Sequence, residues 1–109
     1  MTTLAGGADT LMVIDGLGAA ASFLSPESIT YDGVGNLFIS ESSAGVALVR
    51  KLSMQTLAVK TVAGKSAHGV QLGALPGSLN QPRAVAVVPG FGLAISDELE
   101  NSILLAHGL

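Results

Sequence analysis

The chain contains no cysteine and no tryptophan, and only 4% of its residues are aromatic. The absence of cysteine excludes both a disulfide framework and a thiolate metal site. Charged residues are also few, at 12% of 109 residues with a net charge of −3, whereas an ordinary soluble domain has roughly 25%. No run of 18 apolar residues is present, so we expect no membrane insertion. Because 49% of the residues are apolar in so weakly charged a chain, we expect much of its surface to be covered by other protein.

The chain repeats one pattern at a constant offset of 56 positions, first over 26–41 and again over 82–97. Repetition at such a spacing is typical of solenoids, propellers and repeat arrays. We predict one domain with approximate repeats over 1–57 and 58–109. The matching structural positions are Pro26 with Pro82, Ile39 with Ile95, Glu41 with Asp97, and, in the loop before each copy, Phe23 with Leu79.

Each copy predicts a β-hairpin, because alternating apolar residues flank a short turn. The first turn, DGVGN at 32–36, supplies glycines for positive φ and side chains that bond to the backbone, and PGFG at 89–92 is its counterpart. A third strand is predicted over 46–52 and again over 102–106, and a fourth over 56–63. Four short strands with turns between them have the size of one propeller blade.

Particular motifs recur at matching places in the two copies. They are TTLAG (2–6), DGLGAAASF (15–23), Pro26, DGVGN (32–36), LFI (37–39) and VRKL (49–52) in the first, and TVAG (61–64), LNQP (79–82), GLAISD (92–97) and NSI (101–103) in the second. With these motifs the chain resembles the NHL-repeat family of β-propellers over nearly its whole length. It departs from the family pattern at Val88-Pro89, where an Asp is usual, and at Leu104-Leu105, where Arg-Lys is usual.

The resemblance implies an all-β fold of two four-stranded antiparallel blades. It also implies that residues 2–6 form the outer strand of a blade whose other strands lie elsewhere. Two blades do not close a ring, because propellers typically use about four to eight. We therefore expect the blades to be completed by strand exchange with other copies, as a trimer or tetramer, or by the remaining blades of a parent propeller.

The resemblance further implies that Glu41 and Asp97 accept backbone N–H bonds and cap the loop that follows. In an assembled ring, carboxylates of the interblade loops and of the loops after the second strands would gather on one face. This candidate ligand face, suited to a cationic group or a divalent ion, consists of Asp9, Asp15, Glu41, Glu98 and Glu100.

The two histidines, His68 and His107, are weak metal candidates, since a zinc site needs three or four converging ligands. Arg50, Lys51 and Lys60 are interpreted as a solvated strand edge. With five basic against eight acidic residues, no nucleic-acid binding is expected. No catalytic residue is assigned.

Together with the resemblance, these observations favour a non-enzymatic binding or scaffold module without a cofactor, for interaction with a protein or a small ligand. The resemblance implies that it is part of a bacterial extracytoplasmic propeller or assembles into a closed one. Two alternatives stay open. One is a propeller enzyme of the lyase or lactonase type with calcium or zinc in its central channel, and the other is a propeller fragment with a role in assembly only.

Overall fold

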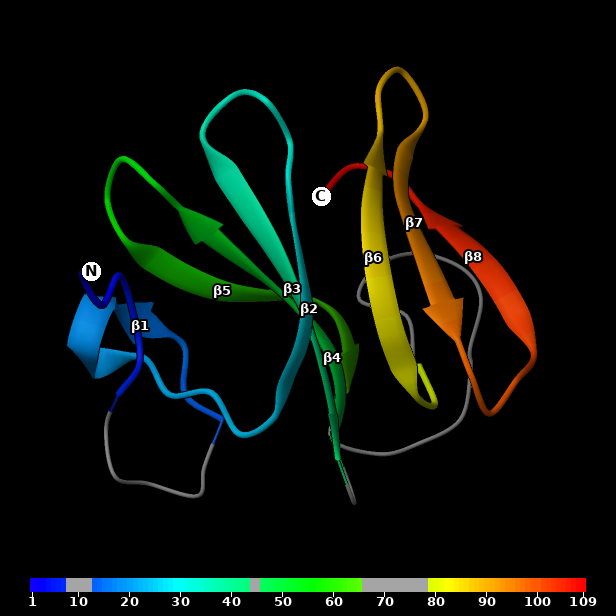
Figure 1. Ribbon diagram of the computed structural model, residues 1–109, viewed down its shortest axis with the longest axis horizontal. Coiled ribbons are helices and arrows are strands. Elements are labelled where there is room, and N and C mark those ends of the chain that lie inside the picture. Colours follow the sequence, from blue (N-terminus) through cyan, green and yellow to red (C-terminus); the bar gives the residue numbers. More distant parts are fainter. Residues whose placement is uncertain (8–12, 44–45, 66–78) are drawn as a thin grey trace.

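The computed structural model describes residues 1–7, 13–43, 46–65 and 79–109 and has two antiparallel β-sheets side by side (Figure 1). The first sheet has the order β1-β5-β4-β3-β2 and the second the order β6-β7-β8. The bounds are β1 (Gly16–Leu17), β2 (Pro26–Tyr31), β3 (Asn36–Ser43), β4 (Val46–Ser53), β5 (Ala58–Lys65), β6 (Pro82–Val88), β7 (Gly92–Asp97) and β8 (Ser102–Ala106). One 3₁₀ turn, η1 (Gly18–Ala20), follows β1. The predicted all-β fold of blade-like antiparallel sheets is confirmed.

The two hairpins have the same register, as the repeat predicts. Pro26 lies opposite Glu41 in the first, and Pro82 lies opposite Asp97 in the second, each followed by a register shift. In the first turn the Asp32 carboxylate accepts the Asn36 backbone N–H at 3.0 Å, which closes the loop between β2 and β3. Equal spacing in the sequence has therefore produced equivalent strands.

The main core lies between the two sheets. Alternation along the strands brings one face of the first sheet against one face of the second. The buried side chains of this intersheet core are Phe38, Ala47, Val49 and Ala63 from the first sheet, with Leu79, Val85, Leu93 and Ile95 from the second repeat.

Two hydroxyl groups also join the inner strands β2 and β6, which lie next to each other (Figure 1). The Val85 N–H donates to Ser28 Oγ at 3.4 Å, and the Val87 N–H donates to Thr30 Oγ1 at 3.3 Å. These bonds are long for N–H···O contacts. They nevertheless give otherwise unpaired amides of β6 an acceptor.

A smaller core lies on the opposite face of the first sheet. Its buried members are Ala21, Ile39, Leu52 and Val59, and partly buried Ala5, Phe23, Leu37 and Leu57 pack against them. We call it the outer core. Among the described residues, this face is covered by loop and N-terminal residues and by no second sheet, so it is less completely enclosed than the intersheet core.

The expected strand over 2–6 does not form within a single chain. Residues 1–7 have no strand, and the Gly6 N–H donates to the carbonyl of Gly18, at the start of η1, at 3.1 Å. The outer edge of β5 is paired by β1, a strand that was not expected, with Gly16 opposite Val59. On β8 the edge away from β7 has no partner strand among the described residues. The physical reason is that residues 2–6 and β8 lie at opposite ends of the chain's structure (Figure 1).

Candidate functional site

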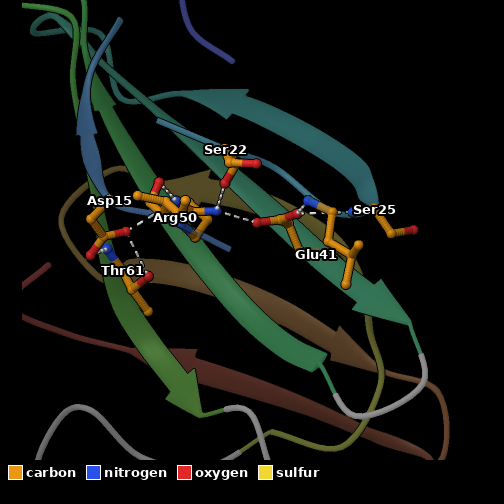
Figure 2. A network of polar contacts seen from close by, with 8 residues as sticks. Asp15, Ser22, Ser25, Glu41, Arg50 and Thr61 are labelled. Atoms are coloured by element: carbon orange, nitrogen blue, oxygen red, sulfur yellow. Dashed lines mark hydrogen bonds and ion pairs between the residues drawn. The ribbon is translucent and has the colours of Figure 1, made fainter. Parts of the chain in front are cut away.

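Arg50 is the centre of the most extensive polar network in the described structure (Figure 2). It lies on β4 and is wholly buried. Its Nη1 donates to the carboxylate of Glu41 and to the Ser22 carbonyl at 3.1 Å, while Nη2 donates to the Ile14 carbonyl at 2.9 Å and to Asp15 Oδ1 at 3.0 Å. A buried guanidinium requires such partners, because an uncompensated charge away from water is very costly. The interpretation of Arg50 as part of a solvated strand edge is therefore wrong.

The sequence contained a signal for this burial. In a strand, alternate residues share a face, so Arg50 lies on the same side of β4 as Leu48 and Leu52. Both leucines are buried. The ring of Phe23 also covers the guanidinium, with 4.8 Å from the Arg50 Cζ to the ring centroid. Only the neighbouring Lys51 and the exposed Lys60 fit the expected polar edge.

Glu41 connects this network to the loop before β2. Its Oε1 accepts the Leu24 N–H at 2.6 Å and the Ser25 N–H at 3.0 Å. The opposite oxygen bonds to Arg50, and the side chain is wholly buried. The carboxylate thus fixes the entry into β2, rather than the loop after its own strand. We call it the Glu41 cap.

Asp97 makes the equivalent cap in the second sheet. Its carboxylate accepts the Asn80 N–H at 2.8 Å and the Gln81 N–H at 3.0 Å, just before β6, and the Glu100 N–H at 3.3 Å in the loop that follows. It is buried as well. Position 104, which aligns with Arg50, is a leucine, so this cap has no arginine. The buried carboxylates of Glu41 and Asp97 therefore bond mainly to backbone amides, which gives both a structural role.

Asp15 closes the first network on its exposed side. Partial burial acts to raise the pKa of Asp15, but hydrogen bonds from the Thr61 amide and hydroxyl and the nearby Arg50 guanidinium outweigh it. The pKa therefore lies below its ordinary value of 3.8, and the carboxylate is charged at neutral pH. Thr61 is on β5, so Asp15 also ties the loop before β1 to the strand that β1 pairs with.

The other acidic residues of the candidate ligand face have partners within the chain. Glu98 pairs with Arg83 at 2.7 Å, and Glu100 accepts a bond from the Asn80 amide side chain at 2.9 Å. Asp9 lies outside the described residues. Glu41 and Asp15 meet at one guanidinium, whereas Glu98 and Glu100 flank the other cap. Within one chain, the four described carboxylates therefore lie at two separate caps.

No group of three or more potential metal ligands occurs among the described residues. His107 is exposed beyond β8, and His68 lies outside the described residues. In the part of the chain that the structure describes, no helix has the length and apolarity to cross a membrane.

An apolar hollow lies over the outer core. It has a volume of about 450 Å³. Its lining includes Phe23, Ile29, Leu37, Ile39 and Leu52 from the loop and strands, with Leu4 from the N-terminal segment. Such a surface suits another apolar protein surface better than an ion.

The described fold is an all-β arrangement of two blade-like sheets. No protein-family model matches the chain, and no curated protein matches it. Among solved structures, the chain is similar to a structural-genomics protein of unknown function from Bacteroides thetaiotaomicron VPI-5482, with 30% sequence identity and a TM-score of 0.81. The similarity covers 91% of this chain but only 25% of that one, so the chain spans about a quarter of the length of its structural relative.

Proposed function

We propose that the chain is a two-blade segment of an NHL-type β-propeller and acts as a non-enzymatic binding or scaffold module. The observation that carries the proposal is the repeated packing unit. Both hairpins share one register, and each is anchored at the same position by a buried carboxylate, Glu41 or Asp97. Blades of this kind stack face to face, as the two sheets do around the intersheet core.

The free edge of β8 supports completion by a further strand. By the repeat, β8 corresponds to β4, which has β5 on its outer side. The N-terminal TLAG at 3–6 resembles TVAG at 61–64 on β5 and is available as that strand. An unpaired strand edge readily accepts an extended segment from another chain.

The use of the charged groups supports a structural rather than a catalytic role. Arg50 and the two capping carboxylates are each occupied by hydrogen bonds that hold loops to strands. The hollow over the outer core is lined mainly by apolar side chains. Recognition by such surfaces depends on shape and apolar contact.

The test is to measure molar mass by light scattering on a sizing column and metal content by mass spectrometry on the same fraction. We expect discrete assemblies of the 10.9 kDa chain. Images of these particles should show a ring of blades around a central channel. We expect no stoichiometric metal. A stoichiometric divalent ion would contradict the non-enzymatic scaffold, and particles without a ring would contradict the propeller.

A further inference from the structure

The outer core repeats one half of the intersheet core. Residues of the second repeat that build the intersheet core have counterparts at the matching positions of the first repeat. The pairs are Leu79 with Phe23, Val85 with Ile29, Leu93 with Leu37, and Ile95 with Ile39, while Ala63 corresponds to Ala5. All these counterparts except Ile29 belong to the outer core. Ile29 lines the adjoining hollow instead.

Exposure shows what the outer core lacks. Val85 is 8% exposed because the first sheet covers it, whereas its counterpart Ile29 is 60% exposed. Tyr31, next but one along β2, is also exposed on this face. The outer core is therefore built on β2 and β3, the counterparts of β6 and β7 in the intersheet core, but no sheet among the described residues faces it.

A face that matches the covering side of the intersheet core lies at the other end of the chain, on the second sheet. Val49 of the first sheet is fully buried in the intersheet core, and its counterpart Ile103 on β8 is 77% exposed. Leu105, on the same side of β8, is exposed too. One chain thus has two apolar faces that match the two sides of its own internal interface.

Charge at the inner strands is also complementary. Within the chain, Glu27 at the start of β2 pairs with Arg83 at the start of β6 at 3.5 Å. These two residues occupy equivalent positions, 56 apart. Stacking the second sheet of one copy on the first sheet of the next would place Arg83 of one beside Glu27 of the other, again with opposite signs.

The backbone of the N-terminal segment is already shaped for this arrangement. Gly64 has φ of 82° where β5 passes β4, and a Cβ there would come within 2.0 Å of the Ala47 carbonyl oxygen. Gly6, its counterpart, has φ of 80°, although among the described residues a Cβ there would meet the Phe23 ring and no neighbouring strand. The same left-handed conformation therefore occurs where no strand yet requires it.

We infer that the apolar face of the outer core is covered by the second sheet of another copy of this chain, in a head-to-tail interface. This inference rests on the proposed propeller and names its partner and contact surface. In this interface residues 2–6 of one copy pair with β8 of its neighbour. Since Val49 lies opposite Ala63 in the first sheet, Ile103 of one copy lies opposite Ala5 of the next. A head-to-tail contact uses two different surfaces and closes into a ring when the rotation permits.

The junction between copies differs from the internal one at the inner strands. Ser28 and Thr30, whose hydroxyls accept N–H bonds from β6, correspond to Ala84 and Ala86. Both alanines are exposed. They offer no hydroxyl to the equivalent amides, those of Ile29 and Tyr31 in the neighbouring copy. The junction between copies is therefore the weaker of the two.

A cysteine pair tests the register directly, since the chain contains no cysteine. Ala5→Cys with Ile103→Cys should give a ladder of disulfide-linked chains on a non-reducing gel. The N-terminal segment and β8, which carry the two positions, lie on opposite sides of one chain, so a disulfide between them must join two copies (Figure 1). The control pairs Ile103→Cys with Val34→Cys at the exposed β2–β3 turn, and it should give no ladder.

Assembled particles without this ladder would overturn the inferred interface and leave the proposed propeller standing. A wild-type chain that stays monomeric at millimolar concentration would also overturn it, because the faces would then require blades of another chain. Failure of the proposed function would instead appear as particles that form no ring, or as particles that contain a stoichiometric metal.

Adding the missing hydroxyls tests the difference between the two junctions. Ala84→Ser with Ala86→Thr should lower the dissociation constant of the assembly by about 3- to 10-fold, as expected for two long hydrogen bonds. The matched control, Ser28→Ala with Thr30→Ala, should weaken the internal junction and leave the dissociation constant between copies unchanged. An unchanged or raised constant in the serine–threonine variant would contradict the inferred interface.

Discussion

The two sheets anchor the entry to their inner strands in the same way, with a buried carboxylate, but only the first adds an arginine. Glu41 reaches the amides of residues 24 and 25 with one oxygen and Arg50 with the other. Asp97 divides its oxygens among three amides and has Leu104 where the arginine would be.

The difference shows that the amide bonds are the common requirement and the ion pair is an addition. The longer Glu side chain accompanies the arginine, and the shorter Asp accompanies the leucine. Arg50 extends the first cap to the Ile14 carbonyl and to Asp15, so that the loop before β1 is tied to the sheet. Replacing residues of one cap with those of the other therefore tests how far the two sheets are interchangeable.

The largest effect is expected from Arg50→Leu. This change leaves the buried Glu41 carboxylate without its cation, and breaking a buried pair typically costs about 3–5 kcal/mol. Urea unfolding at fixed protein concentration measures the loss. The double variant Arg50→Leu with Glu41→Asp reproduces the second cap and should recover more than half of it. If the double variant is no more stable than the single one, the two caps are not interchangeable.

A smaller effect is expected from glycine substitutions that compare β5 with its N-terminal counterpart. Gly64→Ala should cost about 3 kcal/mol, because left-handed backbone is strained for alanine and the Ala47 carbonyl would have to move. Gly6→Ala should cost less, about 1–2 kcal/mol in a dilute, dissociated chain, because the added Cβ would meet the Phe23 ring at 3.0 Å rather than a backbone carbonyl. Thermal or urea unfolding at low concentration measures both, and equal losses would contradict this contrast.

The smallest effect concerns acid stability. Because the folded pKa of Asp15 lies below 3.8, its contribution is complete above that pH and is lost as the pH falls through the lower folded value. Asp15→Asn should therefore lose less stability than the wild type on acidification from about pH 5 to 3. The difference should stay under about 1 kcal/mol, because the carboxylate is half exposed and screened by solvent. An equal loss in Asp15→Asn and the wild type would contradict this contribution of Asp15.

The hairpins could be predicted from the sequence because their signals are local. Turn residues such as Asp32 and alternating apolar positions such as Ile29 and Ile39 determine both strands and their register. The predicted third strands correspond to β4 and β8, and the predicted fourth strand corresponds to β5. The repeat at 56 positions also placed the two capping carboxylates at matching points of the fold.

The features that the sequence did not predict depend on contacts between distant parts of the chain. β1 is only two residues long, Gly16–Leu17, and forms because it pairs with β5 more than 40 positions later. The charge of Arg50 predicts a solvated position, but its place on β4 between Leu48 and Leu52 puts it on the buried face. Its partners at residues 14, 15 and 22 precede β2 in the chain, and no local sequence pattern predicts their contact with Arg50.

The free edge of β8 has a consequence for the fate of newly made chains. Its sequence, SILLA, contains neither a charged residue nor a proline, the usual means of preventing unwanted strand addition. The same edge that would accept an ordered strand is thus open to any extended apolar segment. Aggregation of unpaired chains is the competing outcome, and a single lysine at the exposed position 103 would suppress it together with ordered assembly.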